Sequence, residues 1–312
     1  MENLVISFKV VAPLIILMLL GGFMLRVHIF DDATVKKMNT AVFKVFLPSL
    51  IFYNIYNSSI DDIKDIRAAF YAAIVLMSAF AVCSVVICFV EKDPRKRGVM
   101  VQGFCRSNFV IFGVPLCVSL CGEEILGKIS VAVTIIIPVI NILSVVVLEV
   151  FRGTRPSAKK ILKGIITNPL TIASALGLIA LVSGIKLGSV LINALGDVSK
   201  IATPLALILL GASIDLKKVR GNLRQLFITV FGKLIALPLI GILIAVLMGM
   251  RGGDLALLIA ALASPTAVSS YPMALSMDGD GELAAQIVAF GTVLCIVTVF
   301  LWVFVLKQLG LV

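Results

Sequence analysis

Two short segments of this chain place polar side chains and prolines inside otherwise apolar sequence. One runs from Arg106 to Pro115 and the other from Ala263 to Pro272. A proline inside a helix removes a backbone donor and clashes with the preceding turn, so both segments are expected to unwind and leave free amides and carbonyls. Helix N-termini at such breaks favour negative charge. The chemistry that these residues indicate is the binding of an anion by backbone groups, amides and hydroxyls.

Asn108 is the principal candidate for directional hydrogen bonds to a ligand. It follows Ser107 and would face Ser264 and Thr266 if the two broken segments cross. Each of these residues also has an alternative interpretation without a ligand. Asn108 would donate to a neighbouring carbonyl between helices, and the Arg106 side chain would extend to the membrane interface instead of attracting an anion. Each proline would be a plain kink. The predicted binding residues are Asn54, Arg106, Ser107, Asn108, Gly113, Pro115, Ser264, Pro265, Thr266, Ser269 and Ser270.

Five further ionisable residues lie inside apolar stretches, where charge is costly. Asp197 and Lys200 are three residues apart and are predicted to pair. Lys44, Glu149 and Lys233 are predicted to extend to the membrane surface. Besides Asn54, three polar residues are predicted as possible cavity-lining groups: Tyr53, Thr134 and Asn141.

Several kinds of chemistry have no sequence support. Neither broken segment contains an acidic residue, which disfavours an antiporter that cycles carboxylates through protonation. The chain has a single histidine, His28, and shows no nucleotide-binding loop, metal-ligand cluster or catalytic triad spacing. The six cysteines lack CxxC spacing and are expected to be packing residues. We therefore expect no cofactor, no metal, no catalytic residue and no enzymatic activity.

The elements that carry these residues are predicted to be membrane-spanning helices. Of the 312 residues, 60% are hydrophobic and 14% charged, and the mean hydropathy is +1.14. Unbroken apolar runs of about 20 residues, the length of a membrane-spanning helix, recur along the chain. The net charge of +10 arises mostly from short loops, which indicates membrane topology rather than a nucleic-acid partner. The fold class predicted is an all-α integral membrane protein within the lipid bilayer.

Ten spans are predicted from proline, glycine and charge boundaries. They cover 5–27, 38–57, 66–90, 98–121, 128–150, 164–184, 189–211, 223–249, 254–277 and 282–307. Bases gather around residues 92–97, 152–163 and 217–224, which places these loops in the cytoplasm and both termini outside it. The first span lacks a small-residue cleavage site, so it is not expected to be a removable signal.

An internal repeat relates the two halves of the chain. An offset of 156 relates Pro13 to Pro169 and Pro48 to Pro204, and an offset of 157 relates Ser107 to Ser264 and Pro115 to Pro272. Each half holds five spans, an odd number, so the second half is expected to be inverted, as in secondary transporters. The predicted units are residues 1–150, a basic cytoplasmic connector at 151–163, and residues 164–312. A duplication without transport remains the alternative.

At these residues the chain resembles the auxin efflux carrier family, which includes plant auxin carriers and bacterial malate and malonate permeases. The resemblance spans nearly the whole chain and rests on four motifs: Phe46 to Leu50, Asn108 with Gly113 to Leu116, Thr203 to Ala212, and Ser264 to Ala267. It implies ten helices with spans four and nine broken and crossing, and an elevator-like movement. It also implies a scaffold of spans one, two, six and seven, and a transport domain of spans three to five and eight to ten.

The same resemblance implies that Asn108 contacts the substrate carboxylate and that two copies pair through the scaffold. The short connector at 151–163 is closer to the prokaryotic members than to the plant carriers.

The leading hypothesis is a secondary transporter of small organic anions, mono- or dicarboxylates such as malate or auxin-like acids, in a bacterial cytoplasmic membrane. The sequence does not decide the substrate, the direction of transport or a coupling ion, either H⁺ or Na⁺. Two alternatives remain open. One is a sodium- or proton-coupled carrier of the wider bile acid and antiporter architecture, and the other is a membrane enzyme or sensor that transports nothing.

Overall fold

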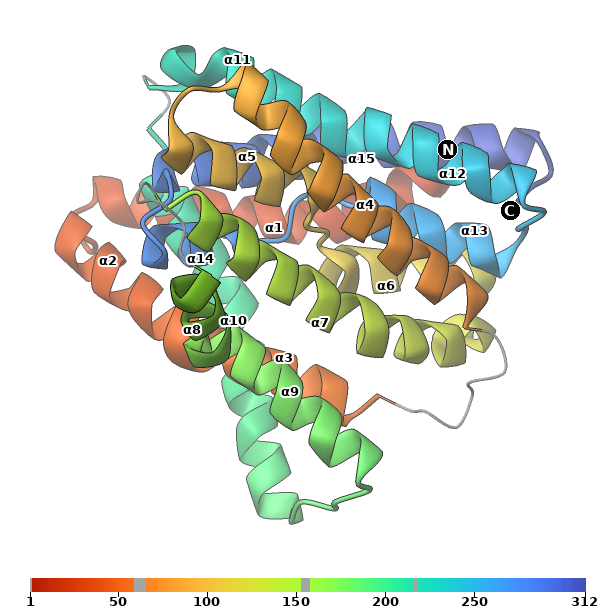
Figure 1. Ribbon diagram of the computed structural model, residues 1–312, viewed down its shortest axis with the longest axis horizontal. Helices are drawn as coiled ribbons and strands as arrows, with labels where there is room; N and C mark the ends of the chain where they lie inside the picture. Colours follow the sequence, from red (N-terminus) through yellow and green to blue (C-terminus); the bar gives the residue numbers. More distant parts are fainter. Residues whose placement is uncertain (1, 59–65, 153–157, 216–217) are drawn as a thin grey trace.

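The computed structural model describes residues 2–58, 66–152, 158–215 and 218–312. Residues 153–157 of the predicted connector and Lys217 of the third basic loop therefore lie outside the described residues. Every regular element among the described residues is helical, as Figure 1 shows. The predicted all-α class is confirmed.

The first half of the chain forms helices in each predicted span. In chain order these elements are α1 (Glu2–Arg26), α2 (Asp32–Ala41), the π-helical turn η1 (Val42–Phe46), α3 (Leu47–Tyr56), α4 (Arg67–Val90), α5 (Pro94–Cys105), the π-helical turn η3 (Phe109–Gly113), α6 (Val114–Cys121), the short 3₁₀ turn η4 (Glu123–Ile125) and α7 (Leu126–Val150).

The second half follows the same course. Its elements are α8 (Ala158–Thr167), α9 (Pro169–Val182), α10 (Ser189–Ser213), α11 (Val219–Phe231), the π-helical turn η5 (Gly232–Ala236), α12 (Leu237–Leu247), α13 (Gly253–Leu258), the π-helical turn η6 (Ile259–Ala263), α14 (Ser270–Ser276) and α15 (Gly281–Gln308).

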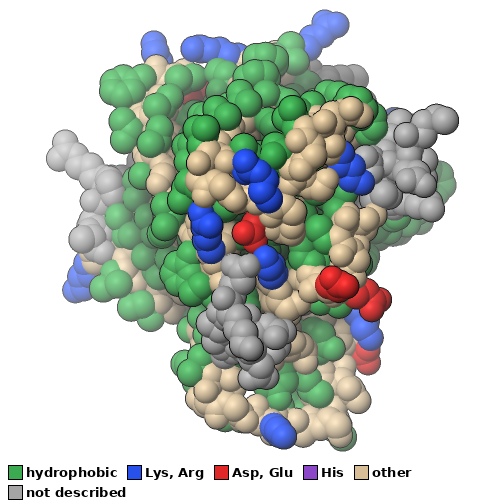
Figure 2. Space-filling view, turned by 90° about the vertical axis from the view of Figure 1, so that its right-hand side faces the viewer, with side chains coloured by type: hydrophobic (Ala, Val, Ile, Leu, Met, Phe, Trp, Pro, Cys, Tyr) green, Lys and Arg blue, Asp and Glu red, His purple; other side chains and the backbone are tan. Residues whose placement is uncertain are grey.

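Six helical stretches of the described chain are long and apolar enough to cross a membrane, and a seventh results if α8 and α9 count as one bent span. The bend between α8 and α9 is 59° and coincides with Pro169, which begins α9. Three shorter apolar stretches accompany them: Val11–Arg26, Phe109–Cys121 and Gly253–Ala263. Large apolar side chains such as Phe89 and Val190 are exposed on the outer helices, and much of the face in Figure 2 is hydrophobic. Such a surface suits a lipid environment.

Prolines account for the four π-helical turns. The turns begin at Val42, Phe109, Gly232 and Ile259, and a proline stands six residues after each of these positions. The proline ring clashes with the carbonyl four residues before it, which lies inside the turn, and a wider turn relieves that clash.

A close contact of two glycines joins α1 to α10. A Cβ atom on Gly21 would lie 1.8 Å from the carbonyl oxygen of Ile208, and one on Gly211 would lie 1.8 Å from that of Met18. Only glycine allows the two backbones to approach so closely. Helix α10 also packs on α3, which in turn packs on α9. These four helices belong to the predicted spans one, two, six and seven.

Candidate functional site

The two broken segments lie against each other in the interior. Helix α5 ends at Cys105, and the next three residues run to η3 in a non-helical conformation. Ser107 pairs with Thr266 in an antiparallel bridge, and the backbone N–H of Asn108 donates to the carbonyl oxygen of Pro265 at 2.9 Å. Residues 157 and 159 positions apart in the sequence thus make adjacent backbone contacts. They join the breaks that the proline pattern predicts.

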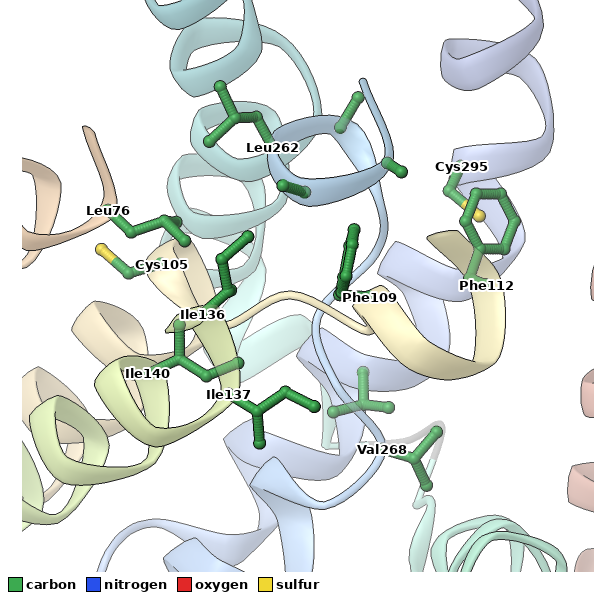
Figure 3. Packing of buried hydrophobic residues seen from close by; sticks show 14 of the residues in the cluster. Leu76, Cys105, Phe109, Phe112, Ile136, Ile137, Ile140, Leu262, Val268 and Cys295 are labelled. Atoms are coloured by element: carbon green, nitrogen blue, oxygen red, sulfur yellow. The ribbon is translucent and has the colours of Figure 1, made fainter. Parts of the chain in front are cut away.

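A cavity of about 70 Å³ adjoins this contact. Figure 3 shows the apolar side chains Phe109, Ile137, Ile140 and Val268 around the two extended segments. The cavity is bounded by α3, α7, α10 and both breaks, and its polar lining residues are Asn54, Arg106, Ser107, Asn108, Asn141, Thr203 and Ser269. A volume of this size accommodates a few water molecules or a carboxylate group.

Arg106 is the basic group of this cavity. Its side chain is 2% exposed, so it does not extend to the interface as the alternative interpretation supposed. One terminal nitrogen, Nη2, donates to Asn141 Oδ1 at 2.8 Å and to Ser269 Oγ at 2.9 Å, while Nη1 faces Met273 Sδ at 2.8 Å. These partners are all neutral. Among the described residues, no carboxylate forms an ion pair with this guanidinium.

Three donor groups at the cavity lack hydrogen-bond partners within the described chain. They are Arg106 Nε, Ser107 Oγ and Asn108 Nδ2. Buried polar groups normally find a partner, and a buried charge is costly without one. The three groups come from consecutive residues, and all three residues line the cavity. The arrangement therefore suits a ligand that accepts hydrogen bonds and carries negative charge.

Of the predicted residues, five line the cavity: Asn54, Arg106, Ser107, Asn108 and Ser269. The other six lie outside its lining. Ser264 Oγ donates to the Ala260 carbonyl oxygen, and Thr266 Oγ1 donates to that of Gly103 at 2.6 Å, so both hydroxyls support the backbone.

The remaining four have packing or backbone roles in this conformation. Pro265 supplies the carbonyl that accepts from Asn108, and Pro115 stands in the first turn of α6. Gly113 lies where η3 meets η6, since a Cβ there would be 3.0 Å from Ala260. Ser270 is buried, and its Oγ has no partner among the described residues.

Comparison with known proteins identifies the family of this chain. The sequence matches the membrane transport protein family over residues 6–155 and 152–303. The chain belongs to this family, the auxin efflux carriers. An uncharacterized transporter of Methanothermobacter thermautotrophicus is 22% identical over 303 residues, which cover 96% of this chain and 98% of that protein. Family membership together with the apolar helices makes the protein a multi-pass membrane transporter.

Two further polar residues line this transporter's cavity, Asn141 and Thr203. The prediction of Asn141 as a cavity-lining group is confirmed, Tyr53 and Thr134 lie outside the lining, and Thr203 was not predicted. Asn141 of α7 holds Arg106 and also donates through Nδ2 to Ser174 Oγ of α9 at 3.4 Å. Its sequence signal is a lone amide in an apolar helix, three residues after Pro138. Thr203 reaches the cavity from α10. It precedes Pro204 in one of the family motifs, and nothing else in the sequence marks it.

A hydrogen-bonded cluster around Tyr271 joins three helices of the transporter. The Tyr271 hydroxyl receives a hydrogen bond from Asn39 Nδ2 of α2 at 3.2 Å and bonds to Ser213 Oγ at the end of α10. Tyr271 belongs to α14, the helix that follows the second break. The cluster therefore ties this break to α2 and α10.

A second cavity of about 460 Å³ opens beside this cluster, among the basic loops. Asp278 lines this cavity and pairs with Arg152 at 2.7 Å, and this hydrogen bond raises the pKa of Arg152. Lys218 pairs with Glu282 at 3.2 Å, which raises the pKa of Lys218. These pairs hold the loop between α14 and α15 against its neighbours.

The structure shows the environment of each of the other ionisable residues that lie inside apolar stretches. The predicted pair of Asp197 and Lys200 is confirmed, with 2.9 Å between Oδ1 and Nζ. Glu149 pairs with Arg152 at 3.0 Å, and Lys44 is exposed. The prediction that Lys233 extends to the surface is wrong, because its side chain is 1% exposed. It lies in the middle of the stretch from α11 to α12, too far from either end.

Proposed function

We propose that this protein carries small organic anions, mono- or dicarboxylates such as malate, across the cytoplasmic membrane. The observation that carries the proposal is the buried Arg106 guanidinium, which has only neutral partners among the described residues and adjoins the unpartnered donors of Ser107 and Asn108. A carboxylate supplies the missing charge and the missing acceptors together. An uncharged ligand would supply hydrogen-bond acceptors without the negative charge, and a cationic ligand would not supply the negative charge either.

The lining of the cavity supports an anion over a cation. Its residues, all from the described part of the chain, include no Asp or Glu. A sodium or proton antiporter that cycles a carboxylate needs such a group at its site. The apolar part of the lining, which includes Leu47, Ile51 and Phe109, suits the hydrocarbon skeleton of an organic acid.

The proposed architecture has ten spans in two inverted halves, with both termini outside the cytoplasm. The cavity lies between α3 and α10 on one side and α7 with the two breaks on the other. In the proposed elevator-like cycle, the second group moves as a transport domain along a scaffold formed by α1, α2, α3, α9 and α10. Such a movement would expose the Arg106 site to each side of the membrane in turn. Pairing of two copies through the scaffold is part of the proposal.

Counterflow of labelled acids into proteoliposomes tests this function. The assay compares malate, malonate, succinate and an indole acid, with empty vesicles as the background. The expected result is accumulation of at least one acid by the wild type and its loss in Asn108→Ala, with no change in thermal stability, because Asn108 Nδ2 has no partner in the described chain.

Asn193→Ala is the matched control, since Asn193 is exposed on α10 far from the cavity lining. Normal counterflow by Asn108→Ala would remove Asn108 from the site. No flux of any acid by folded wild-type protein would overturn the proposal in favour of a cation carrier, an enzyme or a sensor.

A further inference from the structure

Lys233 lies in the middle of one helical stretch that is long and apolar enough to cross a membrane. The stretch formed by α11, η5 and α12 runs from Val219 to Leu247, so Lys233 is 14 residues from each end. At 1.5 Å per residue, each end is about 21 Å away along the helix. The four-carbon stem of lysine does not span that distance. The amine therefore remains inside the protein.

The Lys233 amine has no hydrogen-bond partner in the part of the chain that the structure describes. Its turn packs against α5, α11, α12, α15 and η6. The titratable group that acts on it is the Cys105 thiol of α5, and Cys105 interacts with Cys83 of α4. The thiol of α15, Cys295, donates to its own helix at the Thr292 carbonyl oxygen and lies beside Phe112 (Figure 3).

The charged residues of these packing elements stand near helix ends and not at the level of Lys233. They are Arg95, Lys96 and Arg97 of α5, Arg220 and Arg224 of α11, and Glu282 and Lys307 of α15. No carboxylate of the described chain compensates the amine. An isolated ammonium in apolar surroundings is costly, so these surroundings favour the neutral amine.

The Lys233 turn packs directly on the last residues before the first break. A Cβ on Gly232 would lie 1.8 Å from the ring of Phe104, and one on Gly103 would lie 3.0 Å from Thr229 of α11. The Gly103 carbonyl also accepts the hydrogen bond of Thr266 from the second break. The segment 103–105 thus contacts the turn of Lys233 and the crossing point, and it leads into Arg106.

The Lys233 turn packs on the segment that Arg106 directly follows, and two positive charges in an apolar interior repel each other. An anion in the Arg106 cavity removes that opposition. By linkage, binding of the anion then favours protonation of the amine, and protonation favours binding of the anion.

We infer that Lys233 is a proton-binding site through which this transporter carries a proton together with its anion. The amine takes a proton from water on one side when the anion binds and returns it to water on the other side when the anion leaves. No bond other than N–H forms or breaks. The inference rests on the proposed function, and it identifies the coupling ion.

The test measures acid flux and proton flux in the same proteoliposomes. Vesicles contain a pH-sensitive dye, the voltage is clamped with potassium and valinomycin, and an inward gradient of the labelled acid that the wild type carries is imposed at equal pH. The wild type is expected to acidify the lumen in proportion to acid influx.

Lys233→Met keeps the length of the side chain and removes no hydrogen bond that the described structure contains. It is expected to retain counterflow but to lower the ratio of protons to acid by at least about fivefold. Lys44→Met is the matched control, because Lys44 also lies in a π-helical turn but is exposed. It should leave the ratio unchanged.

Three results would overturn the inference. They are acid influx without acidification in the wild type, an unchanged ratio in Lys233→Met, and loss of counterflow in folded Lys233→Met, which would show a structural role. The first of these needs no variant, so the test holds even if Lys233→Met fails to fold. No acid flux in the wild type would instead overturn the proposed function, and the inference with it.

Discussion

The two broken segments meet at one point but use their polar side chains in opposite ways. In the first, the side chains of Arg106, Ser107 and Asn108 line the cavity, and each retains a donor without a partner in the described chain. In the second, the hydroxyls of Ser264 and Thr266 donate to backbone carbonyls. The comparison teaches that the first break presents groups to a ligand, while the second mainly holds the crossing in shape.

Replacing Arg106 by Gln is the strongest way to break this comparison. The change keeps a polar side chain but removes the only charge among the described residues of the cavity lining, so the apparent affinity for the acid should fall by about 100-fold or more. Initial rates of uptake over a range of acid concentrations measure this. Arg106→Lys, which keeps the charge, should retain part of the uptake activity. Equal uptake rates in Arg106→Gln and in the wild-type protein would contradict an anion site at Arg106.

Replacing Thr266 by Val tests the supporting role of the second break. The change removes the hydrogen bond to the Gly103 carbonyl and leaves that buried acceptor unsatisfied, which should cost about 1–3 kcal/mol of stability. Thermal unfolding of the purified protein measures the loss. The affinity of the remaining folded protein for the acid should stay near the wild-type value. A large loss of affinity at unchanged stability would place Thr266 with the ligand instead.

Replacing Ser107 by Ala gives the converse and smallest effect. Ser107 Oγ has no partner in the described chain, so its loss should leave the unfolding temperature unchanged. The loss of one neutral hydrogen bond to the ligand should weaken acid binding by about threefold to tenfold. Concentration dependence of uptake measures the affinity. A drop in stability with unchanged affinity for the acid would show that Ser107, like Thr266, supports the fold and does not contact the ligand.

The positions of the breaks were predictable from local chemistry. Proline cannot donate a helical hydrogen bond, and both breaks combine proline with nearby polar residues, whereas the helices of Pro48 and Pro238 continue after their π-helical turns. Apolar runs likewise predicted the six helical stretches that are long and apolar enough to cross a membrane, because hydropathy and helix length are properties of neighbouring residues. The pairing of Asp197 with Lys200 follows for the same reason, since residues three apart share a helix face.

The roles of individual side chains were less predictable. Ser107 and Ser264 look alike in sequence and occupy matching positions of the repeat, yet one lines the cavity and the other bonds to Ala260. Asn141 could be singled out only as a polar residue in an apolar helix. Its contact with Arg106 joins α7 to the first break and depends on how the helices pack.

The amino-acid sequence by itself determined that this is an all-helical membrane protein with two proline-broken segments, and it located the family motifs. Only the tertiary structure decided which donors remain unpartnered and which basic residues are enclosed. Lys233 shows the difference most clearly: in sequence it is a lysine in an apolar run, which usually reaches the surface. Its burial depends on α5, α15 and η6, which are distant in the chain and close its surroundings only when the helices have packed.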